Sequence, residues 1–352
     1  MTGAFRLYPE SRRFIMIKET IAKLVDGKEL TRQESYETLK EIMSGNATPA
    51  QIGSFITALR IRGESADVIA GGVQAMREKL IAIATPEGNV VDIVGTGGDQ
   101  QHTFNISTTA AFVVAGAGVM VAKHGNRRVS SSCGAADVLT ELGVNIEIGP
   151  PQMEKCIREA GIAFLFAPAL HPAMKYASAP RSEVGIRSIF NILGPLSNPT
   201  GARRGVLGVY TRDLVKLFSG ALAQLGSVHM FVAHGLDGLD EITTTGKTAM
   251  GEVRGGDIRL FELDPRDYGI PLTDSASLRG GDSAANALLV KEVLSGKTGP
   301  KRDIVLLNAA VTIMAGGGAE TIEAGLTAAA KSIDSWAAME KLEKLVALTN
   351  EK

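Results

Sequence analysis

The stretch Val90-Val91-Asp92-Ile93-Val94, followed by Gly95-Thr96-Gly97-Gly98-Asp99, decides the fold of this chain. A mostly apolar run that ends at a glycine-rich turn is typical of a buried strand. A helical pattern beginning near Ser107, a second strand over 118–122 and a basic loop over 123–128 complete a strand–helix–strand unit. The crossover of such a unit is right-handed in about 98% of cases. We therefore expect both loops to leave the same edge of one parallel sheet.

That sheet edge gathers three features that attract anions. The glycine-rich turn offers backbone N–H groups, the helix beginning near Ser107 directs its positive end there, and Lys123 supplies an ammonium group. Ligands of open α/β sheets bind at the carboxyl ends of the strands. The turn matches neither the Walker A sequence nor the dinucleotide G-x-G-x-x-G pattern, which disfavours nucleotide hydrolysis and hydride transfer. The residues predict a polyphosphate site.

A second informative feature is the acidic pair Asp240-Glu241, which follows a predicted strand over 228–233. Adjacent carboxylates at a strand end are usually part of a solvated loop. Beside a polyphosphate, however, two more negative charges would be repulsive without a cation between them. Mg²⁺ takes hard oxygen ligands and shares them with substrate phosphates. The pair therefore predicts a magnesium site.

Composition limits the classes of protein to consider. The chain has 352 residues, 45% of them hydrophobic and 21% charged, as in an ordinary soluble enzyme of two domains. A net charge of -1 argues against a nonspecific nucleic-acid partner, and two cysteines exclude a disulfide framework. We find no apolar run of membrane-spanning length and no signal peptide, so we expect a cytoplasmic protein with no membrane partner.

The N-terminal part of the chain has helical periodicity from Ile15 to about Leu80, which predicts about four helices. Thr31 and Glu34 have the spacing of a capping box. Apolar helices of this kind can also pair across a dimer axis. Residues 85–88 mark the passage to a region in which strands and helices alternate.

The remaining chain predicts an α/β domain with a mostly parallel central sheet flanked by helices. Residues 171–199 interrupt the alternation, because they are helical but rich in Pro, Gly and Arg, and we place them with the N-terminal helices. We thus expect a small, discontinuous all-helical domain (1–87 plus 171–200) and a large α/β domain (88–170 plus 201–352). Within the latter we expect strands at 144–148, 162–166, 205–210 and 228–233, a β-hairpin over 242–262 and three or four C-terminal helices.

Single basic residues are weaker evidence for a binding or catalytic role than the motifs above. A lone arginine such as Arg127, Arg128 or Arg187 is normally on the surface. Arg181 lies in the inserted segment, where its planar guanidinium could grip a substrate carboxylate bidentately. His124 is more often a residue that lines a site than a general base.

The order of the motifs resembles the anthranilate phosphoribosyltransferase family over nearly the whole chain. The motifs are Gly95-Thr96-Gly97-Gly98-Asp99, Thr103-Phe104-Asn105-Ile106-Ser107-Thr108, Lys123-His124-Gly125-Asn126-Arg127, Ser130-Ser131, His171-Pro172-Ala173-Met174, Arg181, Gly185-Ile186-Arg187, the run 191–199, His234-Gly235-Leu236-Asp237-Gly238 and Asp240-Glu241. The resemblance implies Mg²⁺-dependent transfer of a phosphoribosyl group from phosphoribosyl pyrophosphate to the amine of anthranilate, in tryptophan biosynthesis. It also implies two magnesium ions per subunit, a homodimer through the helical domain, and a fold shared with pyrimidine nucleoside phosphorylases.

The resemblance also implies roles for individual residues, carried over by position. Lys123, Asp99 and Arg181 would serve catalysis, Gly95, Asn126 and Arg181 would contact anthranilate, and Ser107, Asp240 and Glu241 would hold magnesium. At Ala135 many relatives have Ser, so only a backbone contact is expected there. Contacts to phosphoribosyl pyrophosphate would come from Gly95, Gly98, Asp99, Thr103, Asn105, Ile106, Ser107, Thr108, Lys123, His124, Gly125, Asn126, Arg127, Ser130, Ser131 and Ala135.

Two alternatives stay open at this point. A pyrimidine nucleoside phosphorylase would share the fold, but it would leave the pairing of Asn126 with Arg181 unexplained. A non-catalytic relative that binds nucleic acid would carry a basic groove and an eroded pyrophosphate loop. Here the loop and the acidic pair are intact and the net charge is near zero.

Overall fold

A computed structural model of the protein describes residues 16–98, 101–127 and 133–351. The helices and strands of this part follow in the order α1 (Ile17–Val25), α2 (Arg32–Met43), α3 (Pro49–Arg62), α4 (Ala66–Arg77), β1 (Val90–Gly95), α5 (Ile106–Gly116), β2 (Met120–Gly125), α6 (Ala135–Glu141), α7 (Pro150–Ala160), β3 (Ile162–Phe166), α8 (Ala167–Leu170), α9 (Lys175–Val184), α10 (Ile189–Leu193), β4 (Arg204–Gly208), α11 (Asp213–Gln224), β5 (His229–Gly235), β6 (Thr248–Arg254), β7 (Asp257–Leu263), α12 (Ser283–Leu294), α13 (Pro300–Ala315), α14 (Ile322–Asp334) and α15 (Ala337–Thr349).

The strands form one mixed sheet in the order β3-β2-β1-β4-β5-β6-β7. β1 to β5 pair in parallel, and β6 and β7 continue the sheet as an antiparallel hairpin. The chain builds outward from β1 in one direction through β2 and β3, and from β4 in the other. The sheet therefore has its topological switch point between β1 and β4, where an open α/β sheet leaves a crevice for ligands.

Most predicted elements are confirmed. The four N-terminal helices are present, and the capping box of Thr31 with Glu34 begins α2. The helix predicted near Ser107 is α5, the strand predicted at 162–166 is β3, and four helices follow the hairpin. The hairpin begins only at Thr248, because residues 242–247 form turns whose hydroxyl groups bond one another.

The boundary of the second strand differs from the prediction. β2 extends to Gly125, so Lys123 and His124 lie inside the strand and are buried, not in a basic loop. The reason is the register with β3, which continues in parallel as far as Gly125 opposite Phe166. The loop itself begins at Asn126.

The strand predicted at 144–148 is wrong. The burial of Val144 and Ile146 alternates with exposed neighbours as in a strand, but the segment pairs with no strand. Its backbone is held instead by the end of α15: the Asn145 N–H donates to the Thr349 hydroxyl at 3.2 Å, and Asn350 donates to the Gly143 carbonyl at 2.9 Å. A terminal helix thus takes the place of a neighbouring strand.

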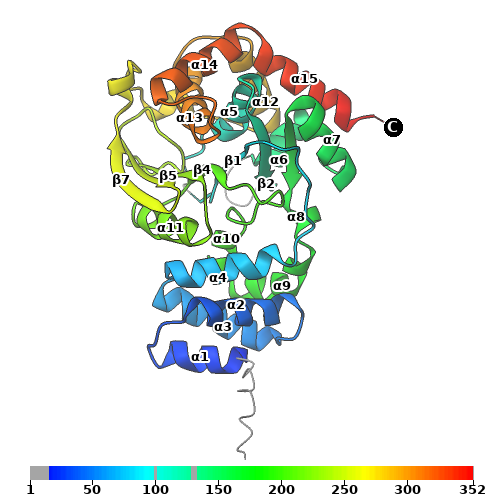
Figure 1. The fold of residues 1–352 in the computed structure, drawn as a ribbon, viewed down its shortest axis with the longest axis vertical. Coiled ribbons are helices and arrows are strands. Elements are labelled where there is room, and N and C mark those ends of the chain that lie inside the picture. Colours follow the sequence, from blue (N-terminus) through cyan, green and yellow to red (C-terminus); the bar gives the residue numbers. More distant parts are fainter. Residues whose placement is uncertain (1–15, 99–100, 128–132, 352) are drawn as a thin grey trace, which may run out of the picture.

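Two apolar clusters cover the two faces of the sheet. Figure 1 shows the helices that lie on its two sides. On β5, Phe231 and Ala233 join the cluster made with α5, α7 and the C-terminal helices α12–α15. Met230 and Val232 point to the other face, toward α11 and α4. The sheet is therefore the middle of three layers, with the N-terminal helices furthest from the C-terminal ones (Figure 1).

The inserted segment packs with the N-terminal helices. α9 lies against α3, and α10 lies against α4. Ala177, Ile189 and Leu193 share one apolar cluster with residues of α1–α4. This packing supports the discontinuous helical domain, whose exact boundaries stay a prediction.

Candidate active site

The central feature of the site is that the glycine-rich loop, α5, β2 and the loop after β5 meet at the switch point. The Gly97 N–H donates to Asp240 Oδ2 at 2.7 Å, and the Ser107 N–H, at the start of α5, donates to Glu241 Oε1 at 3.2 Å. Lys123 Nζ lies 3.3 Å from the Ser107 hydroxyl. Segments separated by more than a hundred residues in the sequence therefore form one polar cluster.

Glycines allow this close approach of the backbone. An ideal Cβ on Gly208, at the end of β4, would lie 1.6 Å from the Asp240 carbonyl oxygen, and one on Gly95 would lie 2.4 Å from Asp240 Oδ2. Any side chain at either position would push the acidic loop away from β1 and β4.

Hydrogen bonds from α13 also fix the position of the acidic pair. The buried Asn308 of α13 accepts from the Ile242 N–H at 3.0 Å and donates to the Ile242 carbonyl at 2.8 Å. Ile242 directly follows Glu241, so one amide clamps the backbone of the loop that carries both carboxylates.

Lys123 and Asp92 are two buried ionisable residues on neighbouring strands below the loops. Lys123 Nζ donates to the Ile93 carbonyl at 2.7 Å, while Asp92 accepts from the His124 N–H and from Asn198. Burial raises the pKa of Asp92 to about 6, although Asn198 and Lys123 favour its ionised form. Burial also lowers the pKa of Lys123, against the opposing effect of the nearby carboxylates. The acidic cluster thus favours a charged ammonium at the base of the site.

A pair of histidines joins β2 to the inserted segment. His124 Nε2 lies 3.1 Å from His171 Nε2, and both rings are buried. Burial lowers the pKa of His124 to about 3, with a further contribution from His171, and it lowers the pKa of His171 to about 4. Both rings are therefore neutral near pH 7.

The start of α5 is braced by α12. The buried Asn286 donates to Asn105 Oδ1 at 3.1 Å and accepts from the Gly281 N–H at 2.8 Å. Asn105 in turn donates to the Cys133 carbonyl at 3.4 Å. These bonds fix Asn105 just before the helix terminus that faces the acidic pair.

From the helical side, Arg187 reaches the glycine-rich loop. Its Nη2 donates to the Gly97 carbonyl at 3.1 Å, and its guanidinium carbon lies 4.1 Å from the centre of the Tyr210 ring. An ideal Cβ on Gly98 would lie 1.9 Å from Arg187 Nη1. Gly98 is therefore needed both for its φ of +88° and for the space that Arg187 takes.

The residues expected to contact an aromatic acid come from both layers of the molecule, and their role stays a prediction. Arg181 is on α9, and its guanidinium lies 5.4 Å from the Phe190 ring. Within the described residues it has no carboxylate partner, and burial lowers its pKa. Asn126 begins the loop after β2, where its side chain accepts from the Arg127 N–H at 2.7 Å.

Arg127 points to acidic neighbours. Its guanidinium lies 3.7 Å from Asp137 and 3.5 Å from Glu147, and it stacks over Phe166. A contact with a phosphate would compete with these ion pairs. Its role as a substrate contact stays a prediction.

The other predicted residues have varied surroundings. Thr103 forms an isolated bridge with Arg279, while Ile106 and Thr108 are buried in the first turn of α5. Gly125 ends β2, and Ala135 begins α6. Asp99, Ser130 and Ser131 lie outside the described residues, so their expected contacts stay predictions.

The donor set fits magnesium. Ser107, Asp240 and Glu241 offer hard oxygen atoms, and the backbone N–H groups of Gly97 and Ser107 help to hold the two carboxylates at this edge of the sheet. The described residues hold no group of three or more His, Cys, Asp or Glu side chains arranged around one point. Substrate oxygens would therefore have to complete the coordination.

Several residues of the site were not predicted as part of it, namely Asp92, Asn198, Asn286 and Asn308. Two of them carry a signal in the sequence: Asp92 is a charged residue inside an apolar strand, and Asn198 belongs to the motif at 191–199. Asn286 and Asn308 are single amides in helices, and no local pattern marks them.

Comparison with known proteins identifies the family. A family described as "Glycosyl transferase family, a/b domain" matches residues 87–339, and its helical bundle domain matches residues 18–80. Anthranilate phosphoribosyltransferase from Trichlorobacter lovleyi is 51% identical over 349 residues, covering 95% of this chain and 100% of the relative. The chain belongs to the anthranilate phosphoribosyltransferase family. A second family member, from Anaeromyxobacter sp. strain K, is 53% identical over 334 residues, covering 95% of this chain and 99% of the relative.

Solved structures of family members agree. Anthranilate phosphoribosyltransferase from Thermus thermophilus has a TM-score of 0.89 at 38% identity, covering 94% of this chain and 99% of that one. The Saccharomyces cerevisiae enzyme in complex with PRPP (phosphoribosyl pyrophosphate) and Mg has a TM-score of 0.86 at 30% identity, covering 95% and 97%. The family expected from the sequence motifs is confirmed. Among the described residues, no helix is both long enough and apolar enough to cross a membrane.

Proposed function

We propose that this chain transfers the 5-phosphoribosyl group of phosphoribosyl pyrophosphate to the amine of anthranilate and releases pyrophosphate. The observation that carries this proposal is the meeting of the glycine-rich loop, the N-terminus of α5, Lys123 and the Asp240-Glu241 pair. Family membership supplies the reaction class. The relative from yeast was crystallised with PRPP and Mg, and in another crystal with 4-fluoroanthranilate.

Most polar groups of the site would stabilise the departing pyrophosphate. As pyrophosphate departs from the anomeric carbon, negative charge grows on its oxygens and positive charge grows on the ribose. Lys123 and the backbone N–H groups at the start of α5 stabilise the negative charge. Magnesium held by Ser107, Asp240 and Glu241 would neutralise further phosphate charge.

Anthranilate is a weak nucleophile, so positioning matters more than activation. Arg181 would hold its carboxylate from the helical side, while Asn126 and Gly95 contact it from the α/β side. The neutral, buried rings of His124 and His171 join β2 to the inserted segment and would help to exclude water between the two layers.

The direct test is a fluorescence assay. Anthranilate fluorescence should fall when phosphoribosyl pyrophosphate and Mg²⁺ are added together, and should stay constant when either is left out. Thymidine or uridine with phosphate serves as the control reaction. Release of a free base there, with no loss of anthranilate, would favour the nucleoside phosphorylase alternative.

The proposal extends to assembly, metal content and location. Val25 and Ile61, at the ends of α1 and α3, are 74% and 79% exposed, which supports a homodimer formed through the helical domain. Light scattering after gel filtration should give twice the mass of the chain. We also propose two magnesium ions per subunit and a cytoplasmic location.

A further inference from the structure

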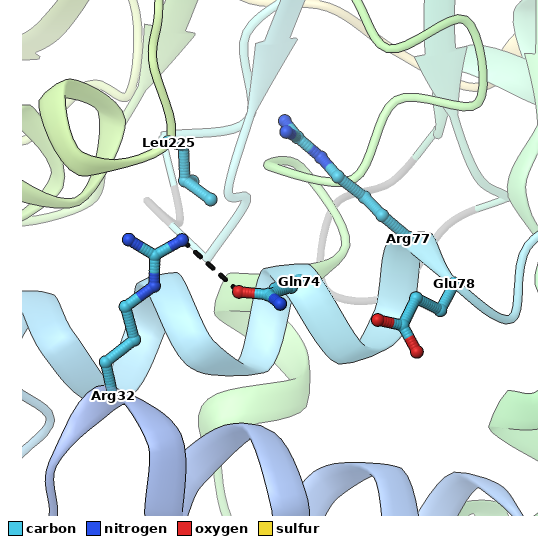
Figure 2. Close-up of a pocket in the computed structure, with 5 residues that line it drawn as sticks. All are labelled: Arg32, Gln74, Arg77, Glu78 and Leu225. Carbon is cyan, nitrogen blue, oxygen red and sulfur yellow. Dashed lines mark hydrogen bonds between the residues drawn. The ribbon is translucent and has the colours of Figure 1, made fainter.

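A second polar cleft lies between the helical layer and the α/β layer, away from the loops described above. It has a volume of about 300 Å³ and is lined by Arg32 at the start of α2, by Gln74, Arg77 and Glu78 on and just after α4, and by Leu225 after α11. Figure 2 shows the guanidinium groups of Arg32 and Arg77 extending from the helices toward the side on which Leu225 lies.

Two guanidinium groups, those of Arg32 and Arg77, line the cleft, and a third, that of Arg203, lies beside it; none has a carboxylate partner among the described residues. Arg32 donates to the Gln224 carbonyl at 3.3 Å and to Gln74 at 3.3 Å, and Arg77 donates to the Leu196 carbonyl at 2.9 Å. Arg203 donates to the Gly226 carbonyl at 2.6 Å, next to Leu225. Carbonyl oxygens satisfy single N–H groups, but they do not neutralise three positive charges.

Arg77 is the most constrained of the three. Its Nε is buried and has no hydrogen-bond partner in the structure. Burial and the neighbouring Arg203 both lower the pKa of Arg77. A buried donor without a partner is costly, and an anion would relieve both this cost and the mutual repulsion.

Among the described residues, the carboxylate that lines the cleft is Glu78, and it does not supply the missing negative charge. Glu78 is 3.1 Å from the Lys40 ammonium and accepts from the Tyr36 hydroxyl at 2.9 Å. Its charge is therefore balanced on the α2 side. The cleft keeps an excess of positive charge.

We propose that this cleft binds a small oxyanion of the phosphate class, gripped by Arg32 and Arg77 from the helical layer and by Arg203 from the α/β layer. Guanidinium groups bind tetrahedral oxyanions through paired, charge-assisted hydrogen bonds. Because Arg77 also holds Leu196, two residues before Asn198, the anion would brace the connection between the two layers.

The test is a calorimetric titration of the full chain with sodium sulfate, a stable phosphate-class dianion. Phosphoribosyl pyrophosphate and Mg²⁺ are kept at saturation to occupy the catalytic site, and sodium chloride holds the ionic strength constant. The variants are Arg203→Gln, which alters an exposed side chain, and the double variant Arg32→Gln/Arg203→Gln. Arg158→Gln on α7 is the matched control, since it removes one exposed positive charge elsewhere.

We expect saturable binding of one sulfate per chain to the native protein and to Arg158→Gln. Arg203→Gln should weaken it several-fold, and the double variant by about tenfold or more, as loss of charge-assisted hydrogen bonds predicts. The Michaelis constant for phosphoribosyl pyrophosphate should stay unchanged. No saturable sulfate binding to the native protein, or equal weakening in Arg158→Gln, or full affinity in the double variant, would overturn the proposal.

Discussion

At the scale of single residues, Asn308 shows how a neutral buried group can set the position of charged ones. Its amide bonds both backbone groups of Ile242, and the acidic pair directly precedes that residue. Asn198 donates to the buried carboxylate of Asp92, and Asn286 donates to the side chain of Asn105 before α5. The charged pair that marks the site in the sequence therefore depends on a buried amide that no local pattern marks.

Replacement of Asn308 by Leu should uncouple the acidic loop from α13. The Ile242 N–H and carbonyl would lose their partner, so stability should fall by about 1–3 kcal/mol and the Mg²⁺ concentration for half-maximal activity should rise. Thr312→Val is a suitable control, because it removes a buried hydroxyl that bonds the Asn308 backbone carbonyl and keeps the side-chain amide of Asn308. Equal metal dependence in both variants would show that Asn308 has only a structural role.

The histidine pair predicts a pH dependence of stability. In the unfolded chain both rings titrate near 6.5, whereas in the folded chain the pKa values are about 3 and 4. Between pH 6.5 and 4 the unfolded state binds more protons, so the free energy of unfolding should fall as pH falls, by about 1.4 kcal/mol per pH unit for each ring. Urea unfolding at pH 7, 6 and 5 measures this slope. In His171→Gln it should be clearly shallower, and an unchanged slope would contradict the assignment.

Arg181→Ala tests the recognition of anthranilate. Loss of the guanidinium should lower kcat/KM for anthranilate by about 2–4 kcal/mol in transition-state free energy, with the Michaelis constant for phosphoribosyl pyrophosphate unchanged. Lys175→Ala, on the same helix and exposed, is the control. Unaltered anthranilate kinetics in Arg181→Ala would remove this residue from the site.

At the scale of elements, the glycine-rich loop is shaped by its neighbours as much as by its own conformation. Gly97 and Gly98 both have positive φ, but only Gly98 faces another side chain closely. A Cβ on Gly97 would meet nothing within 4 Å, whereas one on Gly98 would collide with Arg187. An added side chain would therefore strain the backbone at Gly97, whereas at Gly98 it would both strain the backbone and crowd Arg187.

Gly97→Ala and Gly98→Ala form a matched pair for this comparison. Each should lose about 1–2 kcal/mol of stability from the left-handed conformation. Only Gly98→Ala should also displace Arg187 and raise the Michaelis constant for phosphoribosyl pyrophosphate, by about tenfold or more. Steady-state kinetics with varied phosphoribosyl pyrophosphate would decide, and equal constants in the two variants would count against a role for Arg187 in holding the loop.

A helix or strand could be predicted from the sequence where its local residue pattern agrees with the partners that it has in the folded structure. The strand–loop–helix order from β1 to α5 is of this kind, since turn glycines, apolar periodicity and helix start signals coincide. The segment 144–148 has the same alternation, but its backbone partners belong to the end of α15, some 200 residues further on. Likewise, β2 is longer than its apolar run because β3 continues the pairing to Gly125. Long-range partners decide such cases, and the local sequence does not contain them.

At the scale of the whole molecule, the site lies where the three layers come together. The switch point of the sheet supplies the glycine-rich loop and the acidic pair, while the inserted segment brings His171 and Arg187 from the helical layer. The sequence predicted which segments carry polar chemistry and that they share one sheet edge. It could not predict that Arg187 contacts the glycine-rich loop or that His171 contacts His124, because both contacts depend on how the layers pack.

In the proposed reaction, the acidic pair holds magnesium and the diphosphate together at the switch point. The most direct measurement is activity as a function of Mg²⁺ and phosphoribosyl pyrophosphate for the double variant Asp240→Asn/Glu241→Gln. We predict that the half-saturating concentrations of both rise together by about tenfold or more, because a shared site loses two charged oxygen ligands, while the Michaelis constant for anthranilate stays the same. An unchanged Mg²⁺ dependence, or a change confined to anthranilate, would contradict the account.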